Sequence, residues 1–147
     1  MAQIQRSALV NYSAAQMFEL VNDIESYPQF MQGCVAARVI ERNDEFLVGE
    51  LTLAKAGIRQ TFTTRNTLVY AEEMRMELVQ GAFRSFSATW VFKALAVDAC
   101  KVSLDMQFEF ASGLMDLALE KLFASSANNL VDALVKRAAQ VYGITHD

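Results

Sequence analysis

The sequence has very little of the residue types that most often carry chemistry in small proteins. It holds one histidine, His146, which is the penultimate of 147 residues, and two cysteines, Cys34 and Cys100. A lone terminal histidine excludes Ser–His and Cys–His catalytic arrangements and histidine-based metal sites. The cysteines match no metal-binding or redox spacing, so we expect two free, buried thiols, with a disulfide as the alternative. Because a glycine-rich phosphate loop is also missing, we predict neither catalytic residues nor a metal site nor an enzyme cofactor.

Long apolar runs and an excess of positive charge are also lacking. No apolar stretch approaches the roughly 20 residues of a membrane-spanning helix, and no basic-then-apolar leader follows Met1, so we expect a soluble, cytoplasmic protein. The 13 Lys and Arg residues against 17 Asp and Glu residues give a net charge of −4, which argues against DNA as a partner. Lys55, Arg59 and Arg65 still fall close together, either as the solvated face of a strand or as a local site for an anionic partner.

What the sequence does have is apolar residues in alternation with polar ones. Two runs between residues 81 and 110 alternate in this way, and period-two alternation indicates antiparallel strands with one buried face. The hydrophobic fraction of 53% includes ten Phe and seven Met, which form either a large core or, in part, the lining of a ligand site. Together with those two runs, the expected strands make seven, and the other five cover residues 3–11, 34–42, 45–55, 58–69 and 73–80.

Helical signals complete the pattern. Ser13 begins a capping box that starts a helix over about residues 13–23, and the only proline, Pro28, marks a turn or a second short helical piece. Apolar residues at spacings of three and four predict one long helix from about residue 112 to 142. This order is typical of an α+β helix-grip fold, in which a curved seven-stranded antiparallel sheet wraps around the C-terminal helix. We expect a single domain over residues 1–147, with the space between sheet and helix either filled or left as a cavity.

Two motifs near the start of the chain and several short ones beyond them are recognisable. The first two read Val10-x-Tyr12-Ser13-Ala14-x-Gln16-Met17-Phe18-x-Leu20-Val21-x-Asp23-Ile24 and Tyr27-Pro28-x-Phe30-Met31-x-x-Cys34. The short ones are Phe62-Thr63-x-Arg65-Asn66, Gly81-x-Phe83, Trp90-x-Phe92, Phe108-Glu109-Phe110, Arg137-Ala138 and Tyr142-Gly143. Together they resemble the coenzyme Q-binding and RatA-like (polyketide cyclase/dehydrase-type) family of the START-like helix-grip superfamily. The likeness covers nearly the whole chain, with departures at Gln32 and Ala82, where the family often has proline in a turn.

The resemblance implies a START-like fold, similar to that of the birch-pollen allergen, and non-enzymatic binding of a hydrophobic ligand. That ligand would be ubiquinone or a related polyisoprenoid lipid, held by a chaperone or carrier that supports respiration. Thr64 and Asn66 would orient the quinone carbonyl, or else satisfy each other by hydrogen bonding. Phe83 would gate a cavity or touch a membrane surface, which would place the protein at the periphery of the inner membrane, or else turn back into the core. The residues expected to contact the ligand, each of which core packing explains equally well, are Leu51, Leu53, Phe62, Met74, Met76, Phe83, Phe86, Trp90, Phe108, Leu119, Phe123 and Leu130.

Two other functions stay open at this point. The first is that of a RatA-type toxin, which binds a ribosomal subunit and blocks subunit association, and Lys55, Arg59 and Arg65 are its candidate contacts. The second is a polyketide cyclase-like enzyme, which requires at least one inward-facing titratable group with a shifted pKa. The expected partners are therefore a hydrophobic small molecule or lipid, a ribosomal subunit and a membrane surface.

Overall fold

The computed structural model describes residues 2–55, 57–111 and 117–143. Seven strands form one antiparallel sheet in the order β1-β7-β6-β5-β4-β3-β2. Each strand from β2 to β6 pairs with the next strand along the chain, whereas β1 pairs with β7. The strands are β1 (Ala2–Val10), β2 (Cys34–Arg42), β3 (Phe46–Lys55), β4 (Ile58–Val69), β5 (Glu73–Gln80), β6 (Phe83–Ala96) and β7 (Ala99–Phe110).

Two short helices separate β1 from β2, as predicted. The helix α1 (Ala14–Asn22) begins with the expected capping box, in which the Ser13 hydroxyl accepts from the Gln16 backbone N–H and the Gln16 side chain accepts from the Ser13 N–H. The second is the 3-10 helix η1 (Ile24–Gln29), which contains the proline. Its first residue packs so closely on β3 that a Cβ at Gly49 would overlap the Ile24 side chain. A larger residue at position 49 would therefore force the Ile24 side chain to move.

The C-terminal helical segment differs from the single long helix that we expect. It consists of α2 (Leu117–Asn128) and α3 (Leu130–Tyr142), with a break at Asn129. The Asn129 side-chain amide donates to the Ser125 carbonyl at 2.8 Å and to the Gln32 side chain at 3.3 Å. The Asn129 backbone N–H also donates to the Ser125 carbonyl, at 3.1 Å, so this carbonyl accepts two bonds at the junction of the two helices. The expected start at residues 112–116 lies outside the described residues.

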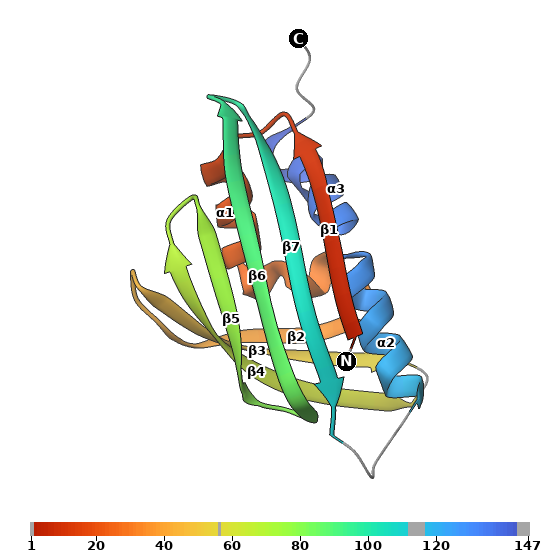
Figure 1. Cartoon of the computed structure of the whole chain (residues 1–147). Coiled ribbons are helices and arrows are strands. Elements are labelled where there is room, and N and C mark those ends of the chain that lie inside the picture. The colour runs from red at the N-terminus through yellow and green to blue at the C-terminus, as the bar shows by residue number, and fades with distance from the viewer. Residues whose placement is uncertain (1, 56, 112–116, 144–147) are drawn as a thin grey trace.

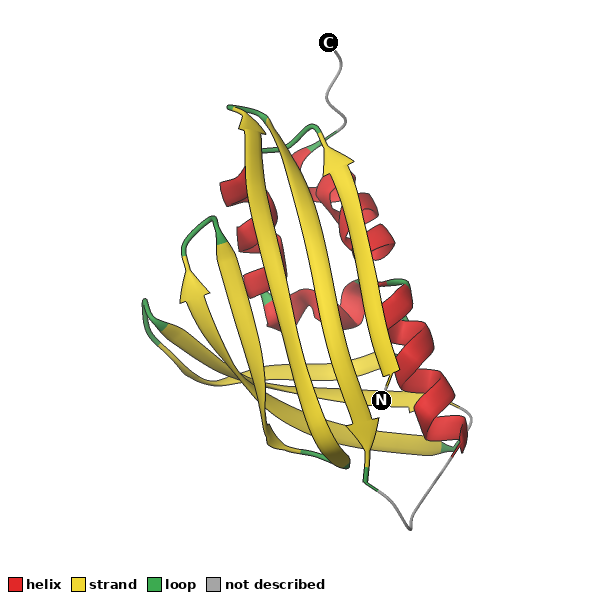
Figure 2. Cartoon of the chain, viewed as in Figure 1, coloured by secondary structure: helices red, strands yellow, loops and turns green. Residues whose placement is uncertain are grey.

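The sheet is strongly curved. β1, β7, β6 and β5 stand side by side as one wall, while β2, β3 and β4 cross beneath them (Figure 1). The helices α1 and α3 and the 3-10 helix η1 lie behind this wall, and α2 lies beside β1 at its edge (Figure 1 and Figure 2). These elements confirm the predicted α+β helix-grip architecture. No helix in the described part of the chain is long and apolar enough to cross a membrane.

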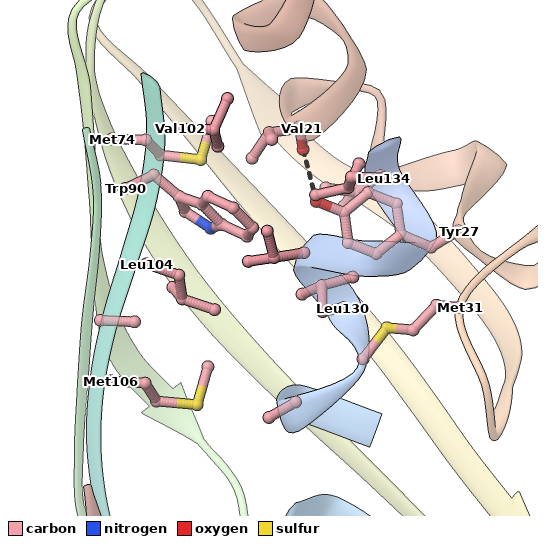
Figure 3. Close-up of a cluster of buried hydrophobic side chains, with 14 of the residues drawn as sticks. Val21, Tyr27, Met31, Met74, Trp90, Val102, Leu104, Met106, Leu130 and Leu134 are labelled. Atoms are coloured by element: carbon pink, nitrogen blue, oxygen red, sulfur yellow. Dashed lines mark hydrogen bonds between the residues drawn. The ribbon is translucent and has the colours of Figure 1, made fainter. Parts of the chain in front are cut away.

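Alternation along β6 and β7 decides which side chains enter the core. Trp90, Leu104 and Met106 point from the sheet toward Leu130 and Leu134 of α3 (Figure 3). The intervening residues of both strands are mostly exposed, so the dry and wet faces predicted from the alternation are present. The residues of β6 and β7 that are buried are Phe83, Phe86, Ala88, Trp90, Phe92, Cys100, Val102, Leu104, Met106 and Phe108.

Candidate functional site

The interior beneath α2 contains a cluster of aromatic rings. Two of them, Phe83 on β6 and Phe123 on α2, are central, because each lies next to the other and to the same four neighbours. The Phe123 ring centroid lies 4.8–6.2 Å from the other five centroids, mostly in edge-to-face geometry, and Phe83 lies 4.6–6.2 Å from its five. These are the separations that favourable aromatic pairs adopt. The phenylalanine cluster consists of Phe62, Phe83, Phe86, Phe108, Phe110 and Phe123.

The residues predicted to contact a ligand are brought together on the concave side of the sheet. Eleven of the twelve are buried and Met76 is half-buried. Some belong to the phenylalanine cluster, while Met74 and Trp90 lie further along the sheet and face α3, which begins with Leu130 (Figure 3). Their burial agrees with core packing and with a ligand wall alike, so ligand contact stays a prediction for each of them.

Phe83 is buried, and its role as a gate stays a prediction. It is the first residue of β6, and its burial agrees with the alternative that it turns back into the core. The turn before it passes close over β4, since a Cβ at Gly81 would lie 2.8 Å from the Phe62 Cβ. This close passage directs Phe83 inward, and the residue therefore has no exposed ring with which to touch a membrane.

The inward-facing polar pair on β4 is self-contained. The Thr64 hydroxyl donates to the Asn66 side-chain oxygen at 2.8 Å, and both residues are buried. This is the arrangement in which the two side chains satisfy each other. The role of orienting a quinone carbonyl remains a prediction.

The buried groups that can titrate are held in their neutral forms. Both cysteines are free and buried, as expected, and burial raises the pKa of the Cys34 thiol to about 11 and also raises the pKa of Cys100. Burial likewise raises the pKa of Tyr27, whose hydroxyl donates to the Val21 carbonyl at 2.6 Å. Among the described residues, the buried polar side chains otherwise are those of Thr52, Thr63, Thr64, Asn66 and Ser126. A thiol or phenol with a raised pKa is a poor nucleophile or base near neutral pH.

The three basic residues proposed as an anionic-partner site do not form one patch. Lys55 ends β3 and pairs with the first residue of β4, so it lies beside Arg59 at the end of the β3–β4 hairpin. Arg65 is on the same strand face as Arg59 but six residues further along β4, about 20 Å away. Its guanidinium lies 3.8 Å from the centre of the Phe46 ring, and its neighbour in β5 is Glu77. Lys55 and Arg59 are therefore close in the backbone at the end of the hairpin, but their side chains leave opposite faces of the sheet, because Lys55 is opposite Ile58 and Arg59 is opposite Ala54.

A polar groove on the helical side was not predicted from the sequence, although Arg137 and Tyr142, which line it, belong to the short motifs. Two adjoining hollows share Glu19, Asn22 and Arg42, and one of them continues to Arg137 on α3. The Asn22 side-chain oxygen is buried without a hydrogen-bond partner, and Arg137 donates to Gln29 at 2.9 Å. These residues are far apart in the sequence, and they meet because α1 docks between α3 and the β2–β3 turn. No single segment could have revealed the groove.

Three comparisons with known proteins bear on this arrangement. The family described as polyketide cyclase / dehydrase and lipid transport matches residues 10–135. The ribosome association toxin RatA of Vibrio cholerae is 45% identical over 143 residues, which cover 97% of this chain and 99% of that protein. The mitochondrial coenzyme Q-binding protein COQ10 homolog B of Xenopus laevis is 21% identical over 145 residues, which cover 96% of this chain and 59% of that protein. The crystal structure of Zhui aromatase/cyclase from Streptomyces sp. R1128 is similar in fold, with a TM-score of 0.81 at 16% identity. The superposition covers 98% of this chain and 99% of that protein chain.

Proposed function

This chain belongs to the polyketide cyclase / dehydrase and lipid transport family, and on that premise we propose that it binds a ribosomal subunit and blocks subunit association. The observation that carries the proposal is the 45% identity to the ribosome association toxin RatA along nearly the whole of both chains. The fold alone is a weaker guide, because one fold serves many functions. The quinone-binding alternative rests on a relative that is 21% identical. Ribosome binding is therefore the better supported of the two.

The surface that we assign to this contact is the end of the β3–β4 hairpin, which carries Lys55 on one face and Arg59 on the other. Ribosomal RNA presents closely spaced phosphates, and Lys and Arg side chains bind them mainly through charge. Because the whole chain carries a net charge of −4, attraction to RNA has to come from a local group of this kind. Binding of this kind weakens as salt rises.

The test is co-sedimentation of the full chain with isolated ribosomal subunits over a range of salt concentrations. We expect wild-type protein to sediment with a subunit, and Lys55→Glu/Arg59→Glu to bind about tenfold more weakly or worse, with a shallower salt dependence, because two phosphate contacts are lost. The matched control is Lys93→Glu/Lys101→Glu on β6 and β7, at the other end of the molecule (Figure 1). Each substitution changes the charge by two units, so both variants move the net charge from −4 to −8.

The outcomes separate the function from the surface. Absence of co-sedimentation for wild-type protein at moderate salt would overturn the proposed function. Equal weakening in the two double variants would instead show that total charge, and not the β3–β4 hairpin, governs binding.

A second function, the binding of a hydrophobic ligand, is supported by the apolar interior and by the lipid transport in the family's description. Burial of one five-carbon isoprene unit contributes about 2–4 kcal/mol before ordering costs, so a few units are enough to hold a polyisoprenoid tail. Native mass spectrometry of protein purified without detergent should then show an added apolar mass that solvent extraction removes. Repeated recovery of the bare chain mass alone would count against this function and leave ribosome binding untouched.

A further inference from the structure

The turn that joins β6 to β7 is apolar and projects at one end of the molecule (Figure 1). We call residues 94–99 the hairpin tip, and their sequence is Ala-Leu-Ala-Val-Asp-Ala. Val97 is 92% exposed and Leu95 is 54% exposed. On the adjoining strand β1, Leu9 is 73% exposed. Large apolar side chains that gather at a projecting end indicate a surface that meets a partner.

Two lysines lie at the base of the hairpin tip. Lys93 on β6 is directly opposite Lys101 on β7, and Leu9 is opposite Lys101 on the other side. Like charges directly opposite each other in a sheet repel and cost stability. The acidic residues nearby are Asp98 in the tip, Glu72, whose carbonyl accepts from the Phe92 backbone N–H, and Glu73 and Asp105, which line one hollow with Lys101. None of them forms an ion pair with these lysines in the described part of the chain.

We propose that the hairpin tip docks on a bilayer surface that contains anionic lipids. Leu95 and Val97 enter the boundary between headgroups and acyl chains, while Lys93 and Lys101 face the headgroup phosphates. A hairpin with an apolar tip and two lysines at its base matches both layers of such a surface. The bilayer is apolar inside and negatively charged at its headgroups. This contact is peripheral and does not depend on the proposed binding of ribosomes.

Other occupants fit the hairpin tip less well. A second copy of the chain, docked tip to tip, would bring two pairs of lysines together and increase their repulsion. A nucleic acid would satisfy the lysines through its phosphates but would leave the apolar side chains facing a charged backbone. An anionic bilayer satisfies the charge and the apolar surface at once. It also places the membrane contact far from Phe83, which is buried at the opposite end of β6.

The test is flotation of the full chain with vesicles of phosphatidylcholine alone or with added phosphatidylglycerol. We expect at least tenfold stronger binding to the anionic vesicles, weakening as salt rises. Leu95→Asn/Val97→Asn and Lys93→Glu/Lys101→Glu should each weaken that binding about tenfold or more. The matched control is Lys55→Glu/Arg59→Glu, which carries the same change of net charge and should still float with the vesicles. Lys55→Glu/Arg59→Glu should thus weaken ribosome binding alone. Lys93→Glu/Lys101→Glu should weaken vesicle binding alone.

A second measurement keeps the test valid if a variant folds poorly. Val97→Cys can be labelled with a polarity-sensitive dye, because the native thiols at Cys34 and Cys100 are buried. Its emission should shift to the blue on anionic vesicles, whereas a label on Val79→Cys, which is 58% exposed before the turn into β6, should not shift. Failure of wild-type protein to bind anionic vesicles, equal binding to neutral ones, or a shift only at residue 79 would overturn the proposal. A dimer that Leu95→Asn/Val97→Asn abolishes would overturn it in favour of a second copy.

Discussion

Phe123→Ala is expected to lower the free energy of unfolding by about 3–5 kcal/mol. Phe123 is 3% exposed, and its ring is surrounded by the five other rings of the phenylalanine cluster. Those rings are carried by three strands of the sheet, so they cannot move together to close the space that the variant leaves. The lost contacts and the remaining cavity therefore both contribute to the cost.

Urea unfolding followed by the fluorescence of Trp90, the only tryptophan, gives the measurement, and the midpoint of thermal unfolding should fall by roughly 10 °C. Phe123→Leu keeps most of the volume and should cost about 1 kcal/mol. Phe30→Ala removes a half-buried ring that packs among the helices, and it is the control for the loss of any phenylalanine side chain. It should lower the free energy of unfolding by less than Phe123→Ala does. A loss under about 1 kcal/mol for Phe123→Ala would mean that the rings are not packed around it as described.

The Cys34 thiol is expected to react with iodoacetamide about 100-fold or more slowly in the folded protein than in the unfolded chain at pH 8. Its pKa in the folded protein is about 11, because burial disfavours the charged thiolate. At pH 8 a thiol with that pKa is about one part in a thousand thiolate, whereas an ordinary thiol with a pKa of about 8.5 is roughly one quarter thiolate. Since the thiolate is the reacting form, the rate should rise about tenfold per pH unit and level off near pH 11.

Mass spectrometry of alkylated peptides over time measures Cys34 and Cys100 separately, and Cys34→Ala identifies the signal of the remaining thiol. Cys100 should also react slowly, because burial raises its pKa in the same direction. Equal rates for folded and unfolded protein at pH 8 would contradict the burial of these thiols. So would a plateau in the folded-state rate near pH 8.5.

Much of the fold could be predicted because the determining signals are local. Period-two alternation marks β6 and β7 directly, since each strand has one face in water. Ser13 and Gln16 are three residues apart, so the start of α1 is also encoded within a few positions. The junction at Asn129 includes instead a side-chain bond to Gln32, which lies far away in the sequence. That hydrogen bond forms only after folding, so the spacing of apolar residues along the helix does not predict it.

The candidate site was less predictable for the same reason. The sequence places Phe62 and Phe123 on inward positions and leaves the direction of Phe83 open, but only packing in three dimensions shows that the three rings touch. Proximity in the sequence was also misleading for Arg65, because an extended strand carries it about 20 Å from Arg59. The same limitation hid the hairpin tip, whose apolar residues look like any other strand end until their exposure is known.

The pairing of β1 with β7 has a consequence for the order of events during synthesis. Residues 2–10 have their sheet partners at residues 100–108. The hydrogen bonds between β1 and β7 therefore cannot form until β7 has been synthesised. Pairings between such distant segments form late and slowly. A nascent chain of this protein therefore lacks its completed sheet for most of its translation. If it acts on ribosomes as we propose, it does so as a released polypeptide and not while still attached to the particle that made it.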